Sequence, residues 1–228
     1  MDAKKEKKSQ VLNIFIFLCV IFLVFLAFTG EKSISEIRME MAKVQEEQEQ
    51  KALEAARREA MGITDHERKT VPAYFQWDRK WAGKGYANGN MANSGCGPTC
   101  MSMVVVYFTG DEDMTPAWMA DFSTKNGYIM GGKTAWKMMN EGAKKLGLQV
   151  KEMSPNEEKM KKELDKERVM ICSMRPGDFT RGGHFIVISG YDENGFKVKD
   201  PNNKENNEQS WSYDQISWQI KNIWSYWL

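Results

Sequence analysis

Residues 94–108 read SGCGPTCMSMVVVYF, a glycine-rich turn that leads into a long apolar run. Pro98 suits the first turn of a helix, where its missing N–H group costs nothing, and the run has the length of a helix that ends near Gly110. Cys96 therefore stands at the start of the predicted helix. Unpaired N–H groups and the helix dipole favour the thiolate there, and the thiolate is the nucleophilic form of cysteine. The alternative is a structural cysteine, which the flanking SGCGPT makes the minority interpretation.

Helical patterns follow this run, whereas strand patterns come later in the chain. Residues 72–97 are loop-rich, and DENG at residues 192–195 is typical of a hairpin turn. Further helices are expected from about Thr115, over residues 133–145 and over residues 156–166. Strands are expected over residues 168–174, 184–190 and 196–200. Short aromatic elements are expected at residues 210–218 and 222–228. Helices followed by an antiparallel sheet predict an α+β domain, and residues 71–228 are enough to bury a core.

Three polar residues of this domain are candidates to assist a thiolate. His184 begins a predicted strand after two glycines, and imidazole is suited to proton transfer near neutral pH; the alternative is an ordinary core histidine. Asp200 ends the next strand, so a hairpin could bring its carboxylate to His184 to orient the ring, unless it is only a turn residue before Pro201. Gln76 lies 20 residues before Cys96 and could complete an oxyanion hole with the Cys96 backbone N–H.

The N-terminal part of the chain has a different composition. Residues 11–28 read VLNIFIFLCVIFLVFLAF, an uncharged run that meets the length needed to span a hydrocarbon core. Four lysines precede it, so the positive-inside rule predicts a cytoplasmic basic segment at residues 1–10, a signal anchor at residues 11–30 and an extracytoplasmic remainder. The alternative is a cleaved signal peptide, which would make the protein secreted.

Residues 31–69 connect this apolar segment to the α+β domain. They are highly charged and consist mainly of strong helix formers. The spacing of Ile34, Ile37, Met41 and Val44 fits a heptad, but Gln48 and Lys51 interrupt it. We therefore predict a solvated helical stalk, with a short coiled coil as the alternative, and the oligomeric state stays open.

The overall composition excludes several classes of function. The chain has 32 basic and 31 acidic residues and a net charge of +1, whereas a dedicated nucleic-acid binder would carry a basic excess. The two histidines, His66 and His184, are too few for a multi-histidine metal site, and the acidic residues 111–113 lack the rest of a calcium loop. Four cysteines are too few for a disulfide-dense scaffold. No metal or cofactor is expected.

Three blocks of sequence together resemble the peptidase C39-like family of papain-fold cysteine peptidases. They are YFQWD at residues 74–78, SGCGPTCMSMV at residues 94–104 and GGHFIVISGYDENGFKVKDPN at residues 182–202, and the resemblance spans about residues 71–218. It implies a papain-like fold in which a helix start carries the nucleophile and an antiparallel sheet carries histidine and aspartate. The site residues that it implies are Cys96 as nucleophile, His184 as general base and acid, Asp200 as its orienting group and Gln76 as oxyanion donor.

Cys100 departs from the family pattern, in which a small residue such as alanine is common. We expect Cys100 to pack in the core. Oxidation with Cys96 and a disulfide with Cys172 are the alternatives that the sequence leaves open.

The implied reaction is hydrolysis of a peptide or amide bond through a thioester, without a cofactor. Together with the predicted anchor, it suggests a membrane-anchored extracytoplasmic cysteine peptidase that acts on a peptide or protein, such as a cell-wall peptide. The sequence contains no G-x-x-x-x-G-K-[ST] loop, so we do not expect a self-contained leader-processing exporter. The alternatives are a non-catalytic peptide- or cell-wall-binding module on the same fold and a scaffold built on the stalk. Trp211, Trp218, Trp224 and Trp227 are expected to pack in the core rather than to form a glycan platform.

Overall fold

The computed structural model describes residues 34–60 and 70–228. The chain divides into two compact units, residues 1–57 and residues 58–228. The predicted anchor at residues 11–30 and the basic segment before it lie outside the described residues, as does His66. Of the helices within the described ranges, none combines the length and the apolar character needed to cross a membrane.

A single long helix, α2 (Ile34–Ala60), lies within the predicted stalk. Its sequence is rich in alanine, glutamate, glutamine, lysine and arginine, the residues with the highest helix propensity. The apolar side chains whose exposure the structure describes include Met41, which is 41% exposed, and Leu53, which is 72% exposed. Local propensity therefore accounts for the helix that the sequence predicts here.

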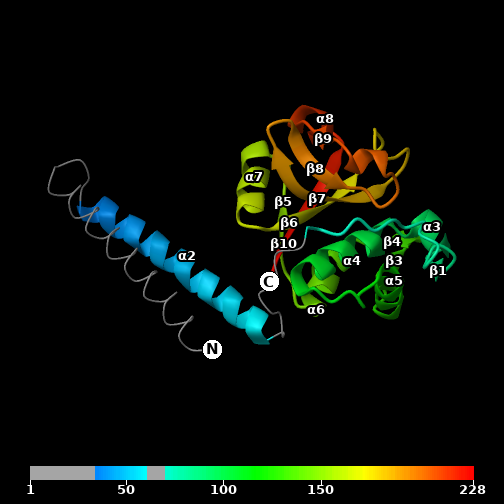
Figure 1. The fold of residues 1–228 in the computed structure, drawn as a ribbon, viewed down its shortest axis with the longest axis horizontal. Helices are drawn as coiled ribbons and strands as arrows, with labels where there is room; N and C mark the ends of the chain where they lie inside the picture. Colours follow the sequence, from blue (N-terminus) through cyan, green and yellow to red (C-terminus); the bar gives the residue numbers. More distant parts are fainter. Residues whose placement is uncertain (1–33, 61–69) are drawn as a thin grey trace. The chain divides into compact units, whose positions relative to one another are not determined.

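The first half of the second unit is mainly helical (Figure 1). Its helices are α3 (Met91–Ser94), α4 (Cys96–Thr109), α5 (Pro116–Lys125), a π-helical turn η1 (Met138–Gly142) and α6 (Ala143–Lys145), and its strands are β1 (Gly85–Tyr86), β2 (Gly89–Asn90), β3 (Ile129–Met130) and β4 (Lys133–Thr134). The expected helix α4 begins at Cys96 and ends where Gly110 adopts the left-handed conformation that terminates helices.

The helix that we expected over residues 133–145 begins later than predicted. Lys133 and Thr134 instead form β4, which pairs with β3 in a two-stranded hairpin. The turn between the strands consists of Gly131 and Gly132, both with positive φ angles of 57° and 72°. Two consecutive residues with positive φ make the tight turn typical of hairpins, and glycine adopts it without strain. Because the glycine pair reverses the chain into a hairpin, the helical segment starts only after β4.

The second half of the unit is a six-stranded antiparallel sheet with strand order β5-β10-β6-β7-β8-β9. Its strands are β5 (Gln149–Met153), β6 (Val169–Met174), β7 (His184–Asp192), β8 (Gly195–Lys199), β9 (Ser210–Trp211) and β10 (Ile220–Trp227), and the intervening helices are α7 (Glu157–Asp165), η2 (Glu205–Asn207) and α8 (Tyr213–Ser217). The strands predicted at residues 168–174, 184–190 and 196–200 are confirmed. Strand β5 was not predicted, and the last strand is a full-length central strand rather than a short terminal element.

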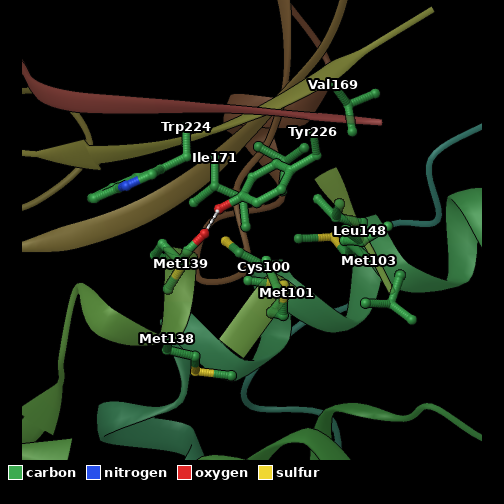
Figure 2. Packing of buried hydrophobic residues seen from close by; sticks show 14 of the residues in the cluster. Cys100, Met101, Met103, Met138, Met139, Leu148, Val169, Ile171, Trp224 and Tyr226 are labelled. Carbon is green, nitrogen blue, oxygen red and sulfur yellow. Dashed lines mark hydrogen bonds between the residues drawn. The ribbon is translucent and has the colours of Figure 1, made fainter. Parts of the chain in front are cut away.

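Both faces of the sheet are buried. One face packs against α4 and η1, where Met103, Ile171 and Trp224 share a core (Figure 2). There the Tyr226 hydroxyl donates a 2.8 Å hydrogen bond to the carbonyl oxygen of Met139. The other face packs around Met160 of α7. Burial on both faces explains why β6 and the first half of β7 are mainly apolar rather than alternating.

The four tryptophans near the C-terminus divide between core and surface. Trp224 and Trp211 are buried, one in each core. The ring centroid of Trp227 lies 4.0 Å from the guanidinium of Arg168. Trp218 is 56% exposed. The expectation of core packing is therefore confirmed for Trp211 and Trp224 and is wrong for Trp218.

Candidate active site

Cys96 is the first residue of α4 and is half-buried. The glycines beside it are required by packing within the chain. A Cβ atom at Gly97 would lie 2.5 Å from the Thr134 Oγ1 atom of β4, and one at Gly95 would collide with Met91. Their lack of a side chain lets the start of α4 fit against β4 and α3.

His184 and Asp200 form a buried pair at one end of the sheet. The Nε2 atom of His184 lies 2.7 Å from the Oδ1 atom of Asp200. The exposed fractions of the two residues are 7% and 0%. The predicted contact across the β7–β8 hairpin is therefore present, and Asp200 is more than a turn residue. Because Nε2 is bound to the carboxylate, Nδ1 is the ring nitrogen left to face Cys96.

A bulge in the β7–β8 hairpin is what puts these two side chains on the same face. Near the turn, Tyr191 pairs with Phe196, but beyond an irregularity at Ser189 the register shifts, so that Ile188 pairs with Val198. Continued along the strands, the shifted register sets Asp200 opposite Ile186, a diagonal neighbour of His184 on the same face. Without the extra residue the alternation would be reversed, and Asp200 would point to the other face of the sheet.

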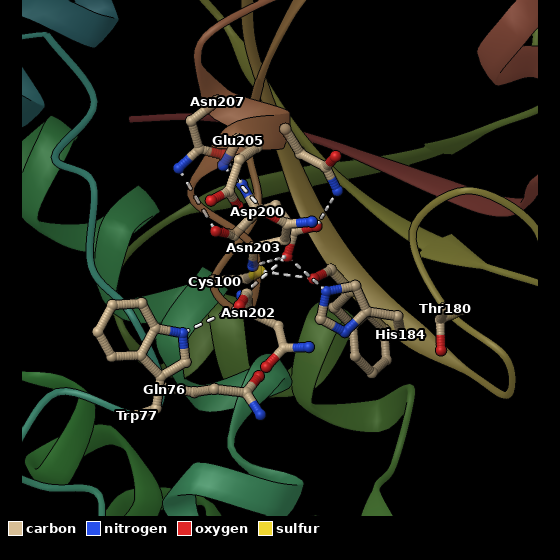
Figure 3. A network of polar contacts seen from close by, with 12 residues as sticks. Gln76, Trp77, Cys100, Thr180, His184, Asp200, Asn202, Asn203, Glu205 and Asn207 are labelled. Atoms are coloured by element: carbon tan, nitrogen blue, oxygen red, sulfur yellow. Dashed lines mark hydrogen bonds and ion pairs between the residues drawn. The ribbon is translucent and has the colours of Figure 1, made fainter.

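The loop after β8 holds the Asp200 carboxylate in place (Figure 3). Oδ1 accepts hydrogen bonds from the backbone N–H groups of Asn202 and Asn203 at 2.8 Å and 3.3 Å. Oδ2 accepts a 2.7 Å hydrogen bond from the side-chain amide of Asn206, which is itself buried. Sequence reasoning missed Asn206; the only available signal was the group of asparagines that follows Asp200 and Pro201 in the sequence.

The electrostatics of the site favour a thiolate–imidazolium pair. Burial opposes ionisation of Cys96, but hydrogen bonding to His184, its positive charge and backbone hydrogen bonds from Phe185 and Gly97 outweigh burial and lower the pKa of the thiol. Burial likewise opposes the charged form of His184, but hydrogen bonds with Asp200 and Cys96 raise the pKa of the imidazole to about 10. Each group thus stabilises the charge of the other, which is the condition for a reactive cysteine.

Gln76 is buried at the edge of the site. Its backbone N–H donates a 2.8 Å hydrogen bond to the carbonyl of Pro201, the residue after Asp200. Its side-chain Nε2 donates a 2.6 Å hydrogen bond to the carbonyl of Ala92. The Oε1 atom is buried without a hydrogen-bond partner. An amide nitrogen carries two hydrogens, and the hydrogen bond to Ala92 uses one of them.

The other two cysteines described by the structure are buried and free. The Cys100 thiol donates a 3.2 Å hydrogen bond to the carbonyl of Phe185. Burial, together with the nearby Cys96 and Asp200, raises the pKa of Cys100 well above its usual range. Burial also raises the pKa of Cys172. The expectation that Cys100 packs in the core is confirmed, and neither of the two alternative disulfides is formed.

Comparisons with known proteins identify one family model and solved structures that are similar to this chain. The model of the Peptidase_C39 like family matches residues 68–227. The peptidase domain of Streptococcus ComA, a bifunctional ABC transporter of a quorum-sensing pathway, is 18% identical, with 58% of this chain and 90% of that chain covered and a TM-score of 0.46. A putative C39-like peptidase from Bacillus anthracis is 16% identical, with coverages of 68% and 94% and a TM-score of 0.39. The comparison with curated proteins gives no match. Because the family match extends over most of the chain and includes Cys96, His184 and Asp200, this chain belongs to the peptidase C39-like family.

Proposed function

We propose that this protein is a cysteine peptidase that hydrolyses a peptide or amide bond through a thioester on Cys96. The observation that carries the proposal is that His184 contacts both Cys96 and the buried Asp200. These contacts lower the pKa of the thiol and raise the pKa of the imidazole. A charged pair of this kind supplies a nucleophile and an acid at the same pH.

The first half of the reaction forms the thioester. The Cys96 thiolate attacks the carbonyl carbon, and the carbonyl electrons move to oxygen. The Cys96 backbone N–H and the remaining N–H of Gln76 are the proposed donors to this oxyanion. The oxyanion collapses as His184 gives its proton to the amine nitrogen, and the carbon–nitrogen bond breaks.

The second half releases the acid. Neutral His184 takes a proton from water, and the resulting hydroxide attacks the thioester carbon. The carbon–sulfur bond breaks, which returns the thiolate and the imidazolium. Throughout, Asp200 holds the ring with Nδ1 toward Cys96 and stabilises its positive charge, while Asn206 holds the carboxylate.

We also propose the location. The apolar residues 11–28 and the lysines before them support a single-pass anchor, with α2 in an extracytoplasmic stalk and the peptidase domain beyond it. Exported peptides and cell-wall peptides are then the substrates within reach. Cleavage at the N-terminal segment would instead release the domain as a secreted enzyme.

A non-catalytic binding module on the same fold is the second candidate. The observation that favours it is the 2.6 Å hydrogen bond from Gln76 to Ala92, which already uses one of the two N–H groups of the proposed oxyanion donor. A weakened oxyanion hole reduces turnover without preventing a peptide from binding.

A peptide-library digestion separates the two candidates. The full chain in detergent micelles is incubated with a mixture of defined peptides, and the products are identified by mass spectrometry. We expect cleavage that falls at least about 10³-fold in Cys96→Ser and persists in the matched variant Cys100→Ser. Retained peptide binding with no cleavage by the unmodified protein would support the binding module instead.

A further inference from the structure

A cleft with a volume of about 550 Å³ opens beside the candidate active site. Its lining comes from the ends of three strands and from the segment that leads into β7. The lining includes Lys133 of β4, Arg175 after β6, Lys221 of β10, and Gly182 and Gly183. Cβ atoms built at the two glycines would meet nothing within 4 Å. The backbone of these two glycines is therefore uncovered by other side chains, which leaves room for another chain.

The cleft adjoins both halves of the catalytic pair. Gly183 immediately precedes His184. Another lining residue, Lys133, precedes Thr134, whose side chain occupies the space next to Gly97 at the start of α4. The cleft therefore borders the segment that leads into His184 and the strand that packs against the start of α4.

The charge of the cleft has one sign. Lys133, Arg175 and Lys221 all line it, and none of its lining residues is acidic. In the part of the chain that the structure describes, these three side chains take part in none of the ion pairs. Three cations around one open volume produce a positive potential that an anion would relieve.

Two of the cations are held in position. The Arg175 Nη2 atom donates a 3.2 Å hydrogen bond to the carbonyl of Ile220, which leaves the rest of its guanidinium available. The Lys221 Nζ atom lies 5.3 Å from the ring centroid of Trp136, within the range of a cation–π contact. Positioned cations lose less entropy on binding a carboxylate than freely moving ones. Met174 and Pro176 complete the lining with apolar surface.

We propose that this cleft is a substrate subsite that binds a peptide carboxylate close in sequence to the scissile bond. This proposal rests on the proposed function and adds a substrate class to it, namely acidic peptides. A carboxylate has two sources in a peptide, an aspartate or glutamate side chain and the free C-terminus, and both offer the oxygen pair that arginine and lysine recognise.

The first test compares cleavage of matched peptides by the full chain. From a library with free and amidated C-termini we expect acidic residues to be enriched at one position near the cleavage site. Charge reversal by Lys133→Glu, Arg175→Glu or Lys221→Glu is expected to lower kcat/KM for acidic peptides about tenfold, with little change for glutamine-substituted peptides. Lys159→Glu, on the remote helix α7, is the matched control. Loss of the preference on amidation would assign the C-terminal carboxylate, and its persistence would assign the side chain.

The second test needs no peptide. Cys96 is alkylated with anionic iodoacetate and, separately, with neutral iodoacetamide, and the ratio of the two rates is measured. We expect the triple variant Lys133→Gln/Arg175→Gln/Lys221→Gln to lower this ratio about threefold or more, and added salt to reduce the ratio of the unmodified protein. Thermal unfolding checks that the variants are folded, as expected for three exposed positions.

The two proposals fail in different ways. If Cys96 reacts with neither reagent below the usual pH range of a thiol, the proposed function is overturned. If Cys96 is reactive and peptides are cleaved, but neither the acidic preference nor the rate ratio depends on the three cations, only the subsite is overturned.

Discussion

Cys96 and Cys100 lie one turn apart on α4, yet their thiols have opposite properties. Cys96 is half-buried with a lowered pKa, whereas Cys100 is completely buried with a pKa raised well above the usual range. Phe185 of β7 forms a backbone hydrogen bond with each of the two cysteines. Its backbone hydrogen bond to Cys96 lowers the pKa of that thiol, whereas its carbonyl accepts a hydrogen bond from the Cys100 thiol. One residue of the sheet thus favours the thiolate in one case and the thiol in the other.

The comparison teaches that the position of a cysteine in a helix does not by itself determine its reactivity. The two cysteines share a helix and a neighbouring strand. They differ in that Cys96 also meets the His184 imidazolium, which compensates for the cost of burying a negative charge. Cys100 has no such compensation, and the negative charges nearby oppose its ionisation further.

The largest effect is expected from His184→Ala, which should make the two thiols alike. Without the imidazolium, burial raises the pKa of Cys96, and the rate of its alkylation near pH 6 should fall about 100-fold. The measurement is the pH dependence of iodoacetamide labelling at each cysteine, resolved by mass spectrometry. In the unmodified protein, hydrolysis should decline near pH 10, where His184 loses the proton that the leaving amine needs. If Cys96 of the variant still labels at low pH, the difference between the thiols lies in the helix and not in the histidine.

A smaller effect is expected from Asn206→Ala, which acts through Asp200. The variant removes the side-chain hydrogen bond to Oδ2 and leaves a buried acceptor unsatisfied. We expect kcat to fall about tenfold and the alkaline limb of the pH profile to move below pH 10, because a less well held carboxylate supports the imidazolium less.

Asn203→Ala is the matched control for Asn206→Ala. Asn203 also contacts Asp200, but through its backbone N–H, which the substitution retains. An unchanged pH profile in Asn206→Ala would show that the loop after β8 is structural only.

The smallest effect is expected from Cys100→Ala. The substitution removes one buried sulfur and its hydrogen bond to Phe185, so the free energy of unfolding should fall by about 1 kcal/mol. Labelling of Cys96 should keep its pH dependence, since His184 and Asp200 are untouched. Chemical denaturation measures the first effect and labelling the second. A shift in the Cys96 profile would mean that the second thiol is coupled to the first.

Much of the site followed from local sequence. SGCGPT marks the start of α4, and the glycines before His184, the DENG turn and Asp200 outline the β7–β8 hairpin. The structure brings His184 and Asp200 together as predicted. Gln76 is held by backbone contacts at Ala92 and Pro201 that its spacing from Cys96 could not reveal.

The parts that sequence reasoning missed depend on contacts between distant segments. Strand β10 lies between β5 and β6, so its place in the sheet is set by partners far away in the chain. Strand β5 has few apolar residues and is defined by that pairing alone. The role of Gly97 depends on Thr134, which is distant in sequence, and the role of Asn206 depends on the fold of the loop after Asp200. The pattern of residues within one segment does not indicate which distant segment it contacts.

The bulge at Ser189 has a consequence for how such domains can lose activity. Deleting that one residue would give the hairpin an uninterrupted ladder, and every residue of the motif would still be present in the same order. The carboxylate, however, would turn away from the imidazole, because a strand alternates its side chains with a period of two. The contact between His184 and Asp200 therefore depends on whether the number of residues between them is odd or even, and not only on which residues are present. A relative can keep all of the motif residues in a hairpin that is one residue shorter or longer. In such a relative we expect the histidine–aspartate contact to be lost.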